Sequence, residues 1–278
     1  MKDILTTIIA HKREQVAAEQ RIISRKQMQE QTLAYVASHK LQTAEGHYQP
    51  LHSMKQALAQ SATGIIAEFK RRSPSKGWIK QDADASVITP GYELAGASAL
   101  SVLTDQIFFG GRLDDLCTAR RLTKLPVLRK EFIIDPYQVE QAVLAGADAI
   151  LLIAACLTPF EAERLSAYAH RLGLEVLLEI HSADELSYLS CFPDMLGVNN
   201  RHLGTFVTDV NHSFQLATQL PTDGPLLVSE SGISSPETIC RLRHVGFRGF
   251  LIGETFMTTP SPADTLRTMI QQIETCRC

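Results

Sequence analysis

The chain has 278 residues, of which 45% are hydrophobic and 21% charged, and its formal net charge is −3. This composition is typical of one large globular domain or two small ones, and the near-neutral charge argues against a nucleic-acid partner. No apolar run approaches the length of about 18 residues that a transmembrane helix needs, and the first residues lack the apolar core and cleavage site of a signal peptide. We therefore expect a cytoplasmic protein with no membrane partner.

The cysteines and histidines give no recognisable metal site. The six cysteines are scattered, mostly within apolar segments, and form no C-x-x-C pair, while the nine histidines show no H-E-x-x-H spacing. Free thiols and no metal ligands are the expectation from this pattern. Adventitious metal binding by Cys276 and Cys278 is the alternative.

The first 60 residues are predicted to form helices and no strand. Leu5, Ile8, Ile9 and Val16 have the spacing of an apolar stripe on a helix. The polar stretch 42–53 interrupts this pattern before another short helix begins. Because the segment is too small to bury its own core, we expect residues 1–60 to be a helical extension packed on a second part, residues 61–278.

From residue 65 a pattern of strand, turn and amphipathic helix repeats along the chain. The predicted strands are Ile65–Lys70, Ala99–Leu103, Val127–Arg129, Ala149–Ile153, Glu175–Glu179, Leu196–Asn199, Leu226–Ser229 and Phe250–Ile252. The predicted helices are Ser86–Ala95, Leu113–Leu122, Pro136–Ala145, Pro159–Leu172, Ala183–Leu189, Val210–Gln219, Pro236–Arg243 and Pro262–Thr275. Prolines stand at several helix starts and glycines at helix ends, which supports these boundaries.

Eight such units favour an α/β fold of the closed (β/α)8 barrel type, the TIM barrel. An open doubly wound sheet is the alternative, but it usually has fewer units and a glycine-rich turn after its first strand. No G-x-G-x-x-G motif follows residue 65. Active sites of these barrels lie at the carboxyl ends of the strands, so the residues that end the strands become the candidates.

The first predicted strand ends in Glu68 and Lys70, which are two residues apart and therefore point to the same face. The turn S-P-S-K-G follows at residues 73–77. A structural ion pair at the strand end is the alternative for this charged pair. The other strand ends carry similar groups, which favours an acid–base site over that alternative.

The remaining strand ends carry aromatic, ionisable and glycine residues. They are Phe108, Phe109 and Gly110, then R-K-E-F at 129–132, Glu179, Asn199 and Arg201, the run Ser229–Gly232, and finally Gly253 and Glu254. The cations after the strands predict a receptor for a small polyanion, and they are Lys70, Arg71, Arg72, Lys76, Arg129, Lys130 and Arg201. Unrelated surface charges are the alternative, above all for Arg71 and Arg72. Glycines after the seventh and eighth strands are typical of phosphate-binding barrels.

Taken together and in this order, the motifs resemble the indole-3-glycerol phosphate synthase family. The likeness covers nearly the whole chain and rests on E-F-K-R-R-S-P-S-K-G, S-V-L-T-D-x-x-F-F-G-G, P-V-L-R-K-E-F-I-I-D-P-Y-Q, L-G-V-N-N-R, V-S-E-S-G-I and F-L-I-G-E. The resemblance implies ring closure of 1-(2-carboxyphenylamino)-1-deoxyribulose 5-phosphate, with loss of carbon dioxide and water. It implies a small phosphorylated substrate and neither a metal nor an organic cofactor.

The resemblance also implies roles for single residues. Lys130 would be the general acid and Glu179 the general base, while Lys70 would hold the substrate carboxylate or share the acid role. Glu68 would orient the lysines, and further hydrogen bonds would come from Asn199, Ser231 and Arg201. Substrate-binding positions would be Ser73, Pro74, Phe109, Phe132, Gly232, Leu251, Gly253 and Glu254, with the aromatic rings and Pro74 around the anthranilate and the glycines at the phosphate.

The chain departs from the family pattern at a few loop positions, and other functions remain possible. Glu131 stands where members often carry Asp, Gln106 and Ile107 replace a common charged pair, and His202 replaces a frequent acidic residue. The alternatives are phosphoribosylanthranilate isomerase, a Schiff-base aldolase that uses a lysine as nucleophile, and a barrel that only binds a phosphorylated metabolite. We expect a monomer, because no exposed apolar stripe stands out.

Overall fold

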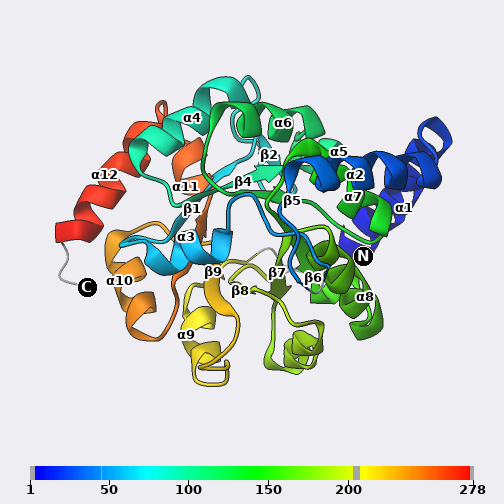
Figure 1. Cartoon of the computed structure of the whole chain (residues 1–278). Helices are drawn as coiled ribbons and strands as arrows, with labels where there is room; N and C mark the ends of the chain where they lie inside the picture. The colour runs from blue at the N-terminus through cyan, green and yellow to red at the C-terminus, as the bar shows by residue number, and fades with distance from the viewer. Residues whose placement is uncertain (1–3, 45, 203–206, 276–278) are drawn as a thin grey trace.

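The computed structural model describes residues 4–44, 46–202 and 207–275. These residues form a closed barrel of eight parallel strands with helices around it (Figure 1). The strands are β1 (Ile65–Phe69), β4 (Ala99–Leu103), β5 (Val127–Lys130), β6 (Ala149–Ile153), β7 (Glu175–Ile180), β8 (Met195–Asn199), β9 (Leu226–Glu230) and β10 (Gly249–Ile252). The pairing of β1 with both β4 and β10 closes the barrel. The predicted TIM barrel is thereby confirmed.

The outer ring consists of the helices that follow the strands. It contains α4 (Ala85–Ala95), α6 (Leu113–Leu122), α7 (Pro136–Ala145), α8 (Pro159–Arg171), α9 (Asn211–Ala217), α10 (Pro236–His244) and α12 (Pro262–Thr275). The segment Ala183–Cys191 (η2) is a 3₁₀ helix, where the sequence pattern predicted an α-helix. Several helix starts are capped by side chains: Thr158 and Glu161 form a capping box at the first turn of α8.

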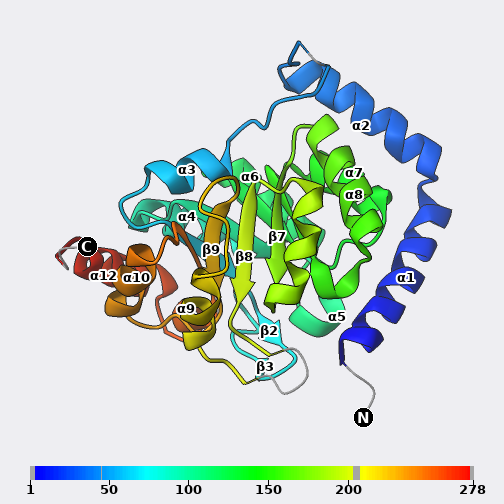
Figure 2. The same ribbon diagram turned by 90° about the horizontal axis from the view of Figure 1, so that it is seen from below.

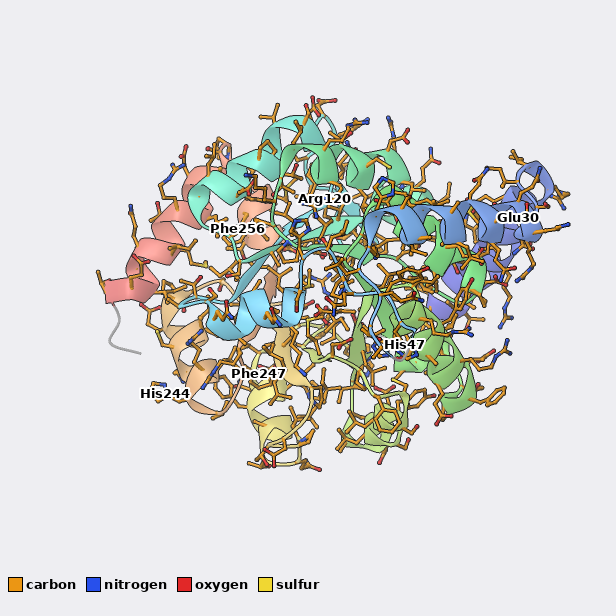
Figure 3. All side chains as sticks on the ribbon, in the orientation of Figure 1. Glu30, His47, Arg120, His244, Phe247 and Phe256 are labelled. Atoms are coloured by element: carbon orange, nitrogen blue, oxygen red, sulfur yellow. The ribbon has the colours of Figure 1, made fainter. Side chains whose placement is uncertain are left out.

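The apolar core has two parts, inside and outside the barrel. The inner cluster contains residues that alternate along the strands, such as Ile66, Leu128, Leu177 and Val228. The larger outer cluster joins the opposite strand faces to the helices and includes Phe247 and Phe256, which Figure 3 labels. This two-residue alternation decides which strand-end side chains point into the barrel.

The first part of the chain forms α1 (Ile4–Ile22), α2 (Arg25–His39) and α3 (Met54–Gln60). The apolar stripe predicted for α1 is buried. Met54 and Leu58 of α3 belong to the inner cluster, so α3 covers the amino-terminal end of the barrel. In Figure 2, α3 lies at one end of the barrel and the hairpin of β2 (Arg72–Ser73) and β3 (Gly77–Trp78) lies at the other, where the strands end.

Several short elements at this carboxyl end were not predicted. They are the β2–β3 hairpin, α5 (Gln106–Phe109), η1 (Ala154–Cys156) and α11 (Glu254–Met257). The Asp105 side chain accepts hydrogen bonds from the backbone N–H groups of Phe108 and Phe109, and Gly110 ends the turn with a φ of 66°. Such local capping can hold one turn of helix without any periodic apolar pattern.

The cysteines differ in part from the expectation. Cys117 and Cys191 are free thiols, whereas Cys240, which lies partly exposed on α10, is disulfide-bonded. The prediction of free thiols is therefore wrong for Cys240. Cys276 and Cys278 lie outside the described residues. Within the described ranges no group of three or more His, Cys, Asp or Glu side chains is arranged to hold a metal ion, and no helix is long and apolar enough to cross a membrane.

Candidate active site

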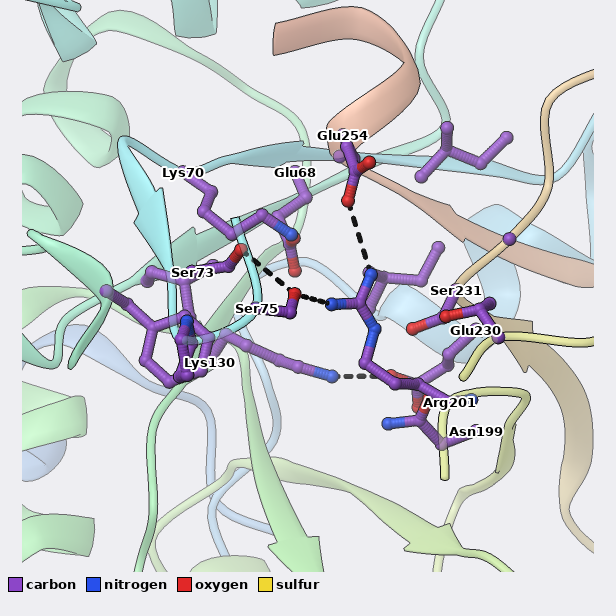
Figure 4. Close-up of a pocket in the computed structure, with 18 of the residues that line it drawn as sticks. Glu68, Lys70, Ser73, Ser75, Lys130, Asn199, Arg201, Glu230, Ser231 and Glu254 are labelled. Carbon is purple, nitrogen blue, oxygen red and sulfur yellow. Dashed lines mark hydrogen bonds and ion pairs between the residues drawn. The ribbon is translucent and has the colours of Figure 1, made fainter. Parts of the chain in front are cut away.

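A pocket of about 660 Å³ opens at the carboxyl end of the barrel (Figure 4). Its lining includes every residue to which the resemblance assigns a catalytic or substrate-binding role, namely Glu68, Lys70, Ser73, Pro74, Phe109, Lys130, Phe132, Glu179, Asn199, Arg201, Ser231, Gly232, Leu251, Gly253 and Glu254. The βα loops thus bring side chains that are far apart in the sequence to one end of the barrel. This is the usual arrangement of an active site in this fold.

Four ionisable side chains form one layer across the barrel. Glu68, Lys130, Glu179 and Glu230 come from β1, β5, β7 and β9, which are alternate strands of the closed sheet. Residues from alternate strands of a TIM barrel share a layer of the interior. We call these four residues the charged layer. It lies directly above the apolar inner cluster, since residues two positions earlier on the same strands belong to that cluster.

Lys130 is the centre of the charged layer. Its Nζ donates to Oε2 of Glu179 at 3.1 Å and to Oε2 of Glu230. The side chains of Glu179 and Glu230 are almost fully buried. An ammonium between two buried carboxylates is held in place and kept away from bulk water, so its protonation state depends on these partners.

The pKa values of this cluster are shifted by burial and by the neighbouring charges. Burial alone would lower the pKa of Lys130, but the carboxylates of Glu230, Glu179 and Glu68 raise it above its usual value. Burial likewise opposes ionisation of Glu179, yet the ammonium of Lys130 lowers the pKa of this carboxyl to about 2. For Glu230 burial dominates over Lys130 and raises the pKa to about 7. One ammonium therefore faces one firmly ionised carboxylate and one that can titrate near neutrality.

A second ion pair stands above Glu68. Lys70 Nζ donates to Oε1 of Glu68 at 2.6 Å, as the two-residue spacing predicts. Ser101 of β4 donates to the other carboxylate oxygen at 3.4 Å. The sequence prediction that these charges share one face of the strand is confirmed. Because Glu68 belongs to the charged layer, the pair is part of the same site as Lys130.

Asn199 links the charged layer to the loop after β8. Its side-chain N–H donates to Oε1 of Glu179 at 2.9 Å, and its carbonyl oxygen accepts the backbone N–H of Arg201 at 3.0 Å. Both the nitrogen and the oxygen of the Asn199 side-chain amide make hydrogen bonds, so this amide can fix the orientation of the Glu179 carboxylate.

Cationic side chains and a backbone turn lie on the side of the pocket near β9 and β10. Arg201 contacts Oγ of Ser75 and donates to Glu254 at 3.2 Å, and Lys76 lies 3.5 Å from the same carboxylate. Ser231 adopts a φ of 67° although it is not glycine, and Gly232 follows with 74°. A backbone turn at the mouth of a pocket can present N–H groups to an oxyanion, and Ser231 and Gly232 both line this pocket.

The opposite wall is apolar. The rings of Phe109 and Phe132 lie with their centroids 5.9 Å apart and tilted by 41°. Ile4, Leu5 and Ile8 of α1 also line the pocket. The sequence predicted an apolar stripe on this helix but gave no sign that it would reach the pocket, because helix periodicity says nothing about which distant surface a helix covers.

Some of the predicted cations do not line the pocket. Arg129 points away from the barrel interior, is buried and donates to the carbonyl oxygen of Gln138 at 2.7 Å. Arg71 donates to Asp115 at 2.8 Å, and Arg72 donates to the carbonyl oxygen of Ile107. For these three arginines the prediction of an anion receptor is wrong; Lys70, Lys76, Lys130 and Arg201 do line the pocket.

Glu230 is the main residue that the sequence reasoning left without a role. It was named among the strand-end residues, yet its contact with Lys130 was not foreseen. A signal existed, because Glu230 stands two positions after the apolar Val228 and so faces inward when that residue does.

These features define the class of protein as a TIM-barrel enzyme whose acid–base groups and anion-binding turns share one pocket. The match to the family model for indole-3-glycerol phosphate synthase extends over residues 5–269. The chain belongs to the indole-3-glycerol phosphate synthase family. The family assignment makes it a carbon–carbon lyase of tryptophan biosynthesis.

Curated relatives and solved structures agree with this assignment. The chain is 58% identical over 274 residues to an indole-3-glycerol phosphate synthase of Bacteroides thetaiotaomicron, with 99% of this chain and 100% of the relative covered. It is 42% identical over 268 residues to one of Acidithiobacillus ferrooxidans, with coverage of 96% and 98%. A crystal structure of tryptophan synthase subunit alpha from Legionella pneumophila shares the fold, with a TM-score of 0.58 at 15% identity over 79% of this chain and 96% of that one.

Proposed function

We propose that the pocket performs the family's reaction with Lys130 as general acid and Glu179 as general base. The chain converts 1-(2-carboxyphenylamino)-1-deoxyribulose 5-phosphate to indole-3-glycerol phosphate, and it releases carbon dioxide and water. The single observation that supports the assignment of roles is the position of Lys130 between Glu179 and Glu230 at the pocket floor.

The first chemical step needs an acid. The aromatic ring carbon bonds to the ketose carbonyl carbon, and the carbonyl oxygen must gain a proton as its charge develops. The raised pKa of Lys130 keeps its ammonium fully protonated before this step. Loss of carbon dioxide then restores the aromatic ring.

The later steps need a base. The hydroxyl that formed from the carbonyl leaves as water with a second proton, while a proton is removed from the substrate. Glu179 is available for this role because Lys130 keeps its carboxylate ionised and Asn199 orients it. Glu230 would then adjust the charge around Lys130, since its own pKa lies near neutrality.

The remaining residues suit substrate binding. Lys70, oriented by Glu68, would hold the anthranilate carboxylate or share the acid role. The ring would lie between Phe109, Phe132 and Pro74. The phosphate would sit near Arg201 and Lys76, with backbone N–H groups at Gly232, Gly253 and Glu254 as donors. Hydroxyl and apolar contacts to the substrate would come from Ser73, Ser231 and Leu251.

The Schiff-base alternative is disfavoured by the electrostatics. A lysine nucleophile must lose its proton before it attacks a carbonyl, and this requires a lowered pKa. The pKa of Lys130 is raised by three carboxylates instead. Borohydride added with the substrate should therefore trap no covalent adduct.

The experiment is a fluorescence assay of indole-3-glycerol phosphate formation with the Lys130→Ala and Glu179→Gln variants. We expect each to reduce turnover by about 10²-fold or more, because each removes an acid or a base from the reacting atoms. Lys26→Ala, on an exposed position of α2, is the control and should leave turnover unchanged. Near-normal turnover in both active-site variants would overturn the roles.

We also propose that the chain works in the cytoplasm, without a metal or organic cofactor. The proposal of no cofactor rests on the reaction itself: ring closure and loss of carbon dioxide and of water involve no net change of redox state, and an acid and a base can promote them. A dialysed sample that has been treated with a chelator should keep its full turnover.

A further inference from the structure

A partly buried histidine outside the pocket lining, His181, lies behind the general base. His181 follows β7, and its Nε2 is 3.4 Å from Oε1 of Glu179. Its other ring nitrogen, Nδ1, is 3.9 Å from the carboxylate of Glu185 in η2. Neither ring nitrogen has a hydrogen-bond partner among the described residues, although both are buried. Two unpaired buried nitrogens between two carboxylates call for an explanation.

The proton balance of the reaction suggests a role for these two nitrogens. A carboxylate anion of the substrate leaves as neutral carbon dioxide, so each turnover takes up one proton from solvent. Two protons are added to the same oxygen, which ends as water, and one proton is removed from the substrate. Glu179 can return the proton that it has taken to Lys130 across their 3.1 Å contact. The other proton must enter the site from outside.

The pocket itself is a poor route for that proton. Glu179 has 4% of its side chain exposed and Lys130 has 13%, and a bound substrate would cover what remains. Glu185, by contrast, has 20% of its side chain exposed on the far side of His181. The two carboxylate oxygens of Glu179 are also divided: Oε2 faces Lys130, and Oε1 faces Asn199 and His181.

We propose that His181 relays protons between solvent at Glu185 and the buried Glu179, and so recharges Lys130 in each turnover. A proton binds at Nδ1, and the N–H bond at Nε2 breaks as an O–H bond forms on Glu179. Glu179 then passes the proton to the neutral amine of Lys130. The distances on both sides exceed a hydrogen bond, so a small ring rotation or one bridging water completes each transfer.

Among the described residues, two carboxylates form ion-pair contacts with the imidazole. Glu179 faces it from β7, Glu185 from η2, and Lys130 lies beyond Glu179. His212 of α9 contacts the backbone carbonyl oxygen of His181 with its Nε2 at 2.8 Å. The backbone N–H of His181 donates to Oε2 of Glu185 at 2.5 Å, so backbone contacts anchor the residue while neither ring nitrogen makes a hydrogen bond. This relay rests on the proposed roles of Glu179 and Lys130.

The test uses His181→Gln and His181→Ala in the full chain, with the same fluorescence assay. Glutamine keeps an amide beside Glu179 but cannot relay a proton. We expect kcat of His181→Gln to fall by about tenfold or more while KM changes by less than about twofold. In His181→Ala, added imidazole should restore kcat in proportion to its concentration. His170→Gln is the matched control, since His170 pairs with Asp194 away from the pocket, and it should match the wild type.

The outcomes separate the relay from a structural role and from the proposed function. Wild-type kcat in His181→Gln would overturn the relay, and so would a slow His181→Ala variant that does not respond to imidazole, because lost packing cannot be rescued by a proton carrier. Both results leave Lys130 and Glu179 intact. Failure of the proposed function would instead appear as near-normal turnover in Lys130→Ala and Glu179→Gln.

Discussion

Two glycines give the charged layer the space that its carboxylates occupy. A Cβ on Gly197 of β8 would lie 2.2 Å from Oε1 of Glu230, and a Cβ on Gly253 would lie 2.4 Å from Oε1 of Glu68. Neither glycine has a positive φ, so close approach and not backbone freedom requires glycine at these positions. The geometry around Lys130 therefore depends on residues that carry no functional group.

Substitution of Gly197 should act on turnover through Glu230. In Gly197→Ala the new methyl group must displace this carboxylate, which contacts Lys130, and we expect kcat to fall by about tenfold. Gly249→Ala is the control, because its Cβ would meet only the apolar Val228 and Leu58. Both variants should lose about 1–3 kcal/mol in urea unfolding, since both crowd the barrel interior. Equal turnover in the two variants would contradict the link to Glu230.

At the scale of residues, the sequence predicted which residues line the site better than it predicted toward which face of a strand each side chain points. Glu68 and Lys70 were placed correctly because the alternation of a strand was applied to them. The same alternation puts Arg129 and Lys130 on opposite faces, yet both were expected at the anion site. Contacts between strands, such as Lys130 with Glu230, need the closed barrel and cannot be obtained from one strand.

At the scale of elements, long periodic segments were predicted well and short ones were not. The bounds of β4, β6, α6, α7 and α12 agree with the sequence prediction to the residue. The four-residue helices α5 and α11 and the two-residue strands of the hairpin have no period to detect, and local capping or tertiary contacts hold them. The position of α1 beside the pocket could not be predicted either, because the ion pairs of Lys12 with Asp105 and Glu131 join residues far apart in the sequence.

Lys40, which follows α2, joins the extension to the end of α8. Its Nζ donates to the carbonyl oxygens of Leu172 and Gly173 at 3.1 and 2.7 Å. Burial lowers the pKa of this lysine to about 8, with Asp148 opposing the shift. Between about pH 8 and pH 10.5 the unfolded chain therefore binds a proton that the native chain has lost, so this group makes the protein more stable as the pH rises through that window.

The measurement compares urea unfolding of the wild type and Lys40→Met at pH 7 and pH 10. From pH 7 to pH 10, the free energy of unfolding of the wild type should rise relative to that of the variant by at most about 3 kcal/mol. This limit follows because one pKa unit corresponds to about 1.4 kcal/mol. Lys26→Met, within α2 and with 85% of the side chain exposed, should show no such gain. A constant difference between wild type and Lys40→Met at both pH values would refute the linkage.

At the scale of the whole molecule, we propose that the chain is a monomer. The most exposed large apolar residues are Ile22, Leu94 and Phe192, and they come from the end of α1, from α4 and from the segment after η2. Scattered single residues of this kind are normal on a monomer. Sedimentation should give one species of about 30.7 kDa, and a dimer that forms with rising concentration would show that an interface exists.

The extension and the barrel should unfold as one unit, because a buried ion cluster joins them. Lys12 of α1 has 1% of its side chain exposed, and its Nζ lies 2.9 Å from both Asp105 and Glu131. Glu131 directly follows Lys130, so this cluster fixes α1 against the strand end that carries the proposed acid. In the wild type, the fluorescence of the single tryptophan, Trp78, and far-UV circular dichroism should report the same urea transition.

Lys12→Met should show how strongly the two parts are joined. The substitution keeps the length of the side chain but leaves Asp105 buried without its cation and Glu131 with Arg129 at 3.9 Å as its remaining one, and we expect a loss of about 3–5 kcal/mol in urea unfolding. KM should also rise, since Ile8 on the same helix lines the pocket. The double variant Lys12→Met with Glu131→Gln removes one of these two buried charges and should recover part of the lost stability. If it recovers none, packing of the lysine stem and not charge pairing holds α1 on the barrel.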